Sequence, residues 1–79
     1  MTQGDKYVKI VEWSEEDGCF IGSCPELFYG GCHGPDARRV FDELCVVIEE
    51  TIRLYEQDAK PLPLPMSGRE FVNAMQAIA

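Results

Sequence analysis

The sequence has few basic side chains. Seven Lys and Arg residues stand against fourteen Asp and Glu residues, so the formal net charge is −7. Proteins that grip a phosphate backbone rely on clustered Lys and Arg, and this composition therefore argues against direct nucleic-acid binding by the chain. An acidic surface instead favours a basic partner.

Long apolar runs are also missing. No run approaches the roughly 20 residues that a membrane-spanning helix needs, and the first residues show no basic leader followed by an apolar stretch. We therefore expect no membrane association and a cytoplasmic location. Without an export signal the cysteines are expected to be reduced thiols, and there are four of them: Cys19, Cys24, Cys32 and Cys45.

The length of 79 residues allows one domain. A chain of this size buries only about 60 to 65% of the surface that its unfolded form exposes. A deep, closed active site is therefore not expected. Small cores often gain stability by oligomerisation.

The first half of the chain predicts three strands. Residues 6–13 are rich in Val, Ile, Tyr and Trp, and the turn after them carries the pair Asp17-Gly18, which suits a tight reversal. Residues 19–24 then form the second strand of a hairpin. Pro25 interrupts the pattern because it cannot donate a ladder hydrogen bond, and a short third strand is predicted over residues 28–33.

A long amphipathic helix is predicted over residues 36–58. Asp36 is the expected N-cap, since its carboxylate can accept hydrogen bonds from the first turn. Apolar residues then recur at spacings of three and four, as on one buried helix face. Cys45, Val46 and Val47 widen this stripe beyond the need of a single sheet. We therefore expect part of the helix to meet another subunit, in a homodimer or tetramer.

The region after the helix has alternating prolines at positions 61, 63 and 65, which force an extended backbone. Leu62 to Leu64 is predicted to form an edge strand or a stiff spacer. Ser67 and Glu70 match a capping box, and an apolar stripe after them predicts a short helix over residues 67–79.

The predicted fold class is thus α+β. It is a three- to four-stranded antiparallel sheet with one long helix packed on one face, in the order β-β-β-α-β, plus a short C-terminal helix. Residues 1–79 are expected to form one domain, with a core over about residues 6–65.

Four short motifs occur in this same order: Pro25-Glu26-Leu27, Gly31-Cys32, Gly34-Pro35-Asp36 and Pro61-Leu62-Pro63. In this order and spacing, over about residues 7–65, the chain resembles the HicB-like antitoxins, whose fold is a partial ribonuclease H fold. The family commonly has threonine where this chain has Asp36, and a single proline in place of Phe28-Tyr29-Gly30. Many members continue into a DNA-binding segment, for which residues 66–79 are too short.

The resemblance implies a function in a toxin–antitoxin system. HicB-like antitoxins bind HicA-like toxins, which are small basic ribonucleases, and cover their active site. The acidic balance of this chain fits such a partner. We expect partner contacts around the proline-bounded turn, where exposed aromatic side chains suit an interface. The candidate partner-binding residues are Glu26, Phe28, Tyr29 and His33.

The sequence gives less support for catalysis or metal binding than for partner binding. A nuclease of the ribonuclease H type needs converging carboxylates around Mg²⁺, and Glu12, Asp36, Asp42 and Glu43 do not form an evident cluster. Zinc binding by Cys19, Cys24, Cys32 and His33 lacks a close Cys-x-x-Cys pair. Cys32 and His33 are neighbours and so point to opposite faces of a strand, which argues against nucleophilic catalysis. We expect no enzyme activity, no catalytic residues, no metal site and no cofactor.

A second hypothesis from another class stays open. The chain is then an orphan oligomeric module that binds a small molecule or an unrelated protein and has no toxin partner. A small basic reading frame next to the gene favours the antitoxin hypothesis, and its absence favours the orphan module.

Overall fold

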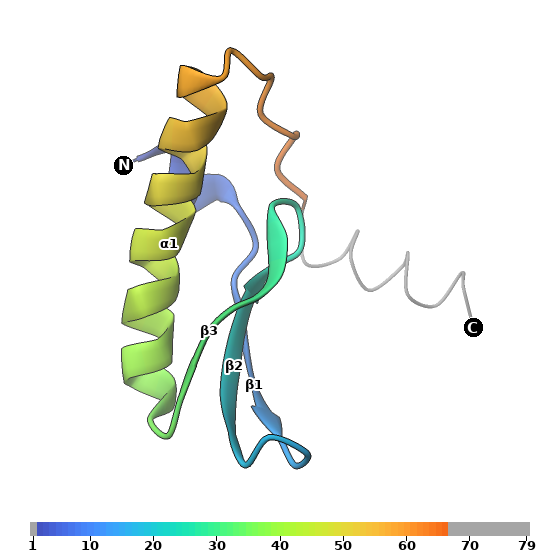
Figure 1. Cartoon of the computed structure of the whole chain (residues 1–79), viewed down its shortest axis with the longest axis vertical. Coiled ribbons are helices and arrows are strands. Elements are labelled where there is room, and N and C mark those ends of the chain that lie inside the picture. Colours follow the sequence, from blue (N-terminus) through green and yellow to red (C-terminus); the bar gives the residue numbers. More distant parts are fainter. Residues whose placement is uncertain (1, 67–79) are drawn as a thin grey trace, which may run out of the picture.

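Three antiparallel strands are followed by one long helix that packs on one face of their sheet (Figure 1). The computed structural model describes residues 2–66. After a short 3₁₀ turn, η1 (Gln3–Lys6), come β1 (Ile10–Ser14), β2 (Cys19–Cys24), β3 (Phe28–Gly34) and α1 (Ala37–Gln57). The strand order is β1-β2-β3. The predicted α+β class, the antiparallel sheet and the packed helix are confirmed.

The first strand begins later than predicted. It starts at Ile10 and not at residue 6, because the Thr2 N–H donates to the Asp5 carboxylate at 3.0 Å and residues 3–6 curl into η1. The hairpin register pairs Ile10 with Ser23, close to the end of β2. The turn of the hairpin lies where expected, and Gly18 has a φ of 66° there, a conformation that glycine adopts without steric cost.

The predicted second strand matches β2 in both bounds, and β3 is one residue longer than predicted. A bulge lies between Gly22 and Cys24, where the pairing of β2 with β3 shifts register. Ser23 fills this irregularity, because its hydroxyl accepts a hydrogen bond from the Gly30 N–H at 2.8 Å. The turn between these strands therefore has a fixed shape.

Both ends of α1 are closed by local hydrogen bonds. Asp36 is the predicted N-cap, and its carboxylate accepts from the Arg38 N–H at 2.9 Å and from the Arg39 N–H at 3.3 Å. At the other end Ala59 has a φ of 54°, and the Lys60 N–H donates to the Tyr55 carbonyl at 2.9 Å. The helix therefore ends where the sequence predicts.

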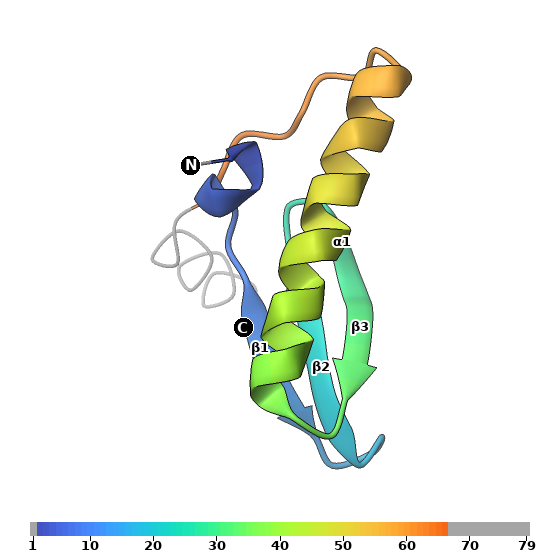
Figure 2. The same cartoon turned by 90° about the vertical axis from the view of Figure 1, so that its left-hand side faces the viewer.

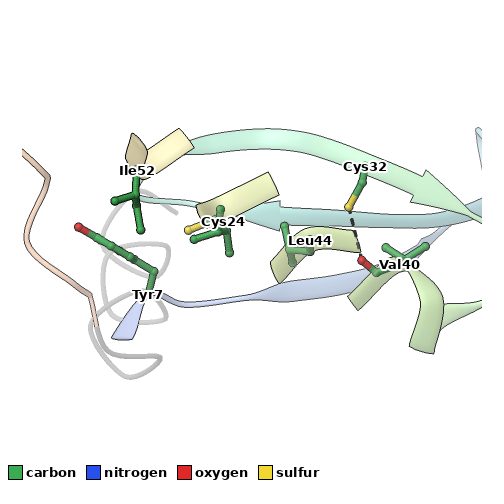
Figure 3. Close-up of a cluster of buried hydrophobic side chains, with 7 residues drawn as sticks. Tyr7, Cys24, Cys32, Val40, Leu44 and Ile52 are labelled. Carbon is green, nitrogen blue, oxygen red and sulfur yellow. Dashed lines mark hydrogen bonds between the residues drawn. The ribbon is translucent and has the colours of Figure 1, made fainter. Parts of the chain in front are cut away.

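The core lies between α1 and the sheet (Figure 3). α1 contributes Val40, Leu44, Ile48 and Ile52, at the four-residue spacing of one helix face. Gly22 allows the close approach of the helix, because a Cβ atom there would lie 2.8 Å from the Cys32 sulfur and 3.0 Å from Val40 Cγ1. The opposing layer supplies Tyr7, Cys24 and Cys32.

The proline-rich segment does not form a fourth strand, although an edge strand was one of the two predicted possibilities. Leu62 to Leu64 has no strand assignment, since the flanking prolines cannot donate ladder hydrogen bonds. The segment instead runs from the end of α1 back toward the turn between β2 and β3 (Figure 1). The Tyr7 hydroxyl donates to the Pro63 carbonyl at 2.6 Å and holds it there. The predicted helix over residues 67–79 lies outside the described residues.

Candidate partner-binding face

The sheet has one covered and one uncovered face within residues 2–66, since α1 lies on one side only (Figure 1). Gly22 and Cys32 point toward the helix. Because side chains alternate along a strand, their neighbours Ile21 and His33 point to the opposite face. Glu12 pairs with Ile21, and Ile21 pairs with His33, so these three side chains form a row across the uncovered face.

A hollow of about 530 Å³ lies over this row. Its lining includes three acidic residues, Glu12, Glu16 and Asp17, of which the last two belong to the β1–β2 turn. The Asp17 carboxylate also accepts a hydrogen bond from the Ser14 hydroxyl at 2.9 Å. Tyr29 lines the same hollow and is 83% exposed. Carboxylates beside an aromatic ring suit a guanidinium or ammonium group, which can pair with the acids and stack on the ring. The arrangement is suited to basic side chains.

Two of the four predicted partner-binding residues lie at this hollow. Tyr29 and His33 are exposed and line it. Phe28 is half-buried and packs against the core, and its ring lies beside Gly31. The structure therefore places Tyr29 and His33 at the surface of β3 and packs Phe28, the first residue of that strand, against the core.

Glu26 is half-buried and has internal hydrogen-bond partners. Its carboxylate accepts from the Met66 N–H at 2.7 Å and from the Val8 N–H at 3.3 Å. The Cys24 thiol lies 3.7 Å from the other carboxylate oxygen and donates to it. Glu26 thus joins the segments before β1 and after α1 to the β2–β3 turn. Its side chain positions the turn and the two segments.

Three residues of the hollow, Glu12, Glu16 and Asp17, were not among the predicted contacts. From the sequence, Glu12 was considered only as a nuclease carboxylate and Asp17 only as a turn residue. The sequence signal for the hairpin is sufficient to predict the position of Glu12, because a tight turn after Ser14 places Glu12 on the same face as Ile21. The row then extends to His33 only through the β2–β3 register, which a bulge shifts and which the sequence does not reveal.

The buried thiols face away from this hollow. Burial, with the nearby Glu26 carboxylate, raises the pKa of the Cys24 thiol to about 11. Burial likewise raises the pKa of Cys32, whose thiol donates to the Val40 carbonyl at 3.5 Å (Figure 3). Cys32 is buried and His33 is exposed, so the prediction that they point to opposite faces is confirmed.

The carboxylates considered for a nuclease lie on separate elements. Glu12 is on the uncovered face of the sheet, and Asp36 caps α1 through its own side chain. Asp42 and Glu43 are exposed on the helix. Between residues 2 and 66, no three His, Cys, Asp or Glu side chains gather closely enough to hold a metal ion. No helix in that range is long and apolar enough to cross a membrane.

Comparisons of the chain with protein-family models, with curated proteins and with solved structures found no match. The likeness to the HicB-like antitoxins therefore stays a resemblance carried by four short motifs. The use of the uncovered face has to be inferred from its own side chains.

Proposed function

We propose that this chain is an antitoxin-like protein that binds a small basic ribonuclease toxin of the HicA type and masks its active site. The observation that carries the proposal is the hollow on the uncovered face, where three carboxylates lie beside an exposed tyrosine. The formal net charge of −7 extends this local preference for basic groups to the whole molecule. The order of the four motifs supports the HicB-like assignment.

In this proposal Tyr29 and His33 contact the toxin directly, while Glu26 and Phe28 hold the turn that presents Tyr29. The carboxylates of the hollow pair with Lys or Arg side chains around the active site of the toxin. Basic residues in such a place bind the RNA phosphates, so covering them blocks the substrate. Complementary charge also raises the rate of association, an effect that weakens with salt.

The test uses the purified toxin encoded by a small basic reading frame next to the gene. Its cleavage of RNA is measured with increasing amounts of this chain, and complex formation is measured by calorimetry. We expect a complex with a Kd of about 1 µM or below and loss of cleavage at equimolar ratio. Absence of a complex at micromolar concentration would contradict the proposal and favour the orphan module.

A pair of matched variants tests the site. Glu16→Lys places a positive charge in the hollow, and Glu15→Lys makes the same change one residue away, at a position that does not line it. We expect Glu16→Lys to weaken binding by about tenfold or more, because it repels a basic partner. Glu15→Lys is expected to weaken binding much less. Equal losses would show that only net charge matters and that the hollow is not the site.

A further inference from the structure

A second exposed surface lies on the opposite side of the molecule, between β1 and the first turns of α1. A groove of about 580 Å³ is lined there by Val11, Ala37, Arg38, Phe41 and Asp42. Phe41 is 41% exposed in this groove. Trp13 is also exposed, but its ring packs edge-on against Phe20, and the residue lines the hollow on the uncovered face and is not part of this groove. Large apolar side chains that remain in water beside a groove are typical of an interface.

The strand that borders this groove is an edge strand. Within residues 2–66, β1 pairs only with β2, so its other side presents backbone N–H and C=O groups without strand partners. Such an edge readily accepts another strand. α1 crosses the sheet diagonally, with its first turns toward β1 (Figure 2). An added strand would therefore meet both the backbone of β1 and the exposed ring of Phe41.

The charges that flank the groove are self-complementary. Arg38 and Asp42 lie one helical turn apart, on either side of Phe41 along the helix. A two-fold axis that passes near Phe41 reverses the direction of the second helix. Each Arg38 is then brought toward Asp42 of the partner subunit. The groove thus contributes no net charge, although the whole chain carries −7.

We propose that this groove is the interface of a symmetric homodimer, in which β1 pairs antiparallel with β1 of a second copy. Adjacent strands lie about 4.8 Å apart, so the two β2 strands would be separated by about 14 Å. The two α1 helices that lie on these sheets would be similarly far apart, which exceeds the 8–10 Å between the axes of directly packed helices. The trench between the two α1 helices therefore needs large side chains, which Phe41 of both copies supplies. A shared patch on both copies is the rule for two-fold dimers.

The interface leaves the uncovered face of each sheet accessible, so it does not depend on the proposed toxin binding. The full chain is measured alone, by sedimentation and by light scattering, over a range of concentrations. We expect a mass of twice the 8.9 kDa of one chain at about 100 µM. A monomer at that concentration would overturn the proposal.

A charge-exchange cycle identifies the interface. In Arg38→Asp both positions are acidic, and in Asp42→Arg both are basic, so like charges face each other across the interface. Each variant alone is therefore expected to dimerise at least about tenfold more weakly. In a mixture of the two variants both ion pairs are restored, and we expect heterodimers close to wild-type affinity. The double variant is expected to recover as a homodimer. Failure of both the mixture and the double variant to recover would overturn the proposed symmetry.

The matched control is Arg39→Asp, which makes the same charge change at a neighbouring residue outside the groove. It is expected to leave the dimer intact, and an equal loss with Arg39→Asp would contradict the assignment. Circular dichroism checks that each variant is folded. Arg38 and Arg39 are both exposed, so their side chains can be changed without opening the core.

Discussion

The face of the sheet under α1 is closed and apolar, whereas the opposite face carries carboxylates, an imidazole and an exposed phenol ring. On the closed side Leu44 and Cys24 are fully buried, and Gly22 brings helix and sheet into contact. Within the described residues, no buried side-chain nitrogen or oxygen lacks a hydrogen-bond partner. On the open side Tyr29 is 83% exposed. One sheet of three strands thus separates the residues that stabilise the fold from those available to a partner.

This separation suits a small binding protein. Within residues 2–66 the core has seven buried apolar residues, which leaves little stability to lose, so polar groups that serve a partner have to lie outside it. Substitutions on the two faces should therefore affect different properties of the protein. Changes under the helix should alter the free energy of unfolding, and changes on the open face should alter binding alone.

The largest effect is expected for Leu44→Ala. Leu44 is 0% exposed, and its truncation leaves a cavity between α1 and the sheet. The free energy of unfolding should fall by about 2 to 5 kcal/mol, as measured by urea denaturation. Val46→Ala on the same helix is the control, since Val46 is 56% exposed and its truncation should cost about 0.5 kcal/mol or less. Similar losses for both would show that α1 is not seated on this face.

An intermediate effect is expected in alkaline solution. The thiol of Cys24 ionises near pH 9 when the chain is unfolded but near pH 11 when it is buried. The contribution of Cys24 to stability is therefore constant below about pH 9 and is lost as the pH rises toward 11, because only the unfolded state releases the proton. The loss should be on the order of 1 to 3 kcal/mol.

Denaturation midpoints measured from pH 7 to pH 10.5 check this prediction. Burial also raises the pKa of Tyr7 and of Cys32, so these residues add to the loss in the same direction. Cys24→Ala should be less stable at neutral pH but should show a shallower alkaline decline. An identical decline in the variant would mean that the Cys24 thiol is not buried.

The smallest effect on stability is expected on the open face. Tyr29→Ala removes a ring that is 83% exposed, and the free energy of unfolding should change by about 0.5 kcal/mol or less. The same variant should bind the toxin more weakly in the calorimetric experiment. A loss of several kcal/mol in stability with unchanged binding would reverse the roles of the two faces.

Most of the fold follows from local signals in the sequence. The hairpin turn at Gly18, the cap at Asp36 and the helical stripe from Val40 to Ile52 each depend on residues close together in the chain. The path of residues 61–66 could not be predicted in this way, because it depends on long-range hydrogen bonds from Tyr7 to Pro63 and from Met66 to Glu26. The start of β1 was missed for a local reason, since the Thr2–Asp5 hydrogen bond and η1 compete with the strand pattern that begins at residue 6.

The candidate site was predictable in part for the same reason. Tyr29 could be identified because it follows a proline-bounded turn, and His33 lies on the same face four residues further along β3. The acids of the hollow belong to another strand and the turn that follows it, and they join His33 only through the pairing of three strands. Glu26 has an internal role because its carboxylate accepts hydrogen bonds from two backbone amides, those of Val8 and Met66. These residues are 18 and 40 positions away in the chain, so no local sequence pattern indicates the contacts.

The carboxylate of Glu26 has a further consequence for the dynamics of the molecule. Since the amides of Val8 and Met66 donate to the same carboxylate oxygen, displacement of the Glu26 side chain breaks both hydrogen bonds at once. Amide hydrogen exchange at the two positions should therefore be correlated, and both should belong to one locally opening unit that is separate from the helix and the sheet.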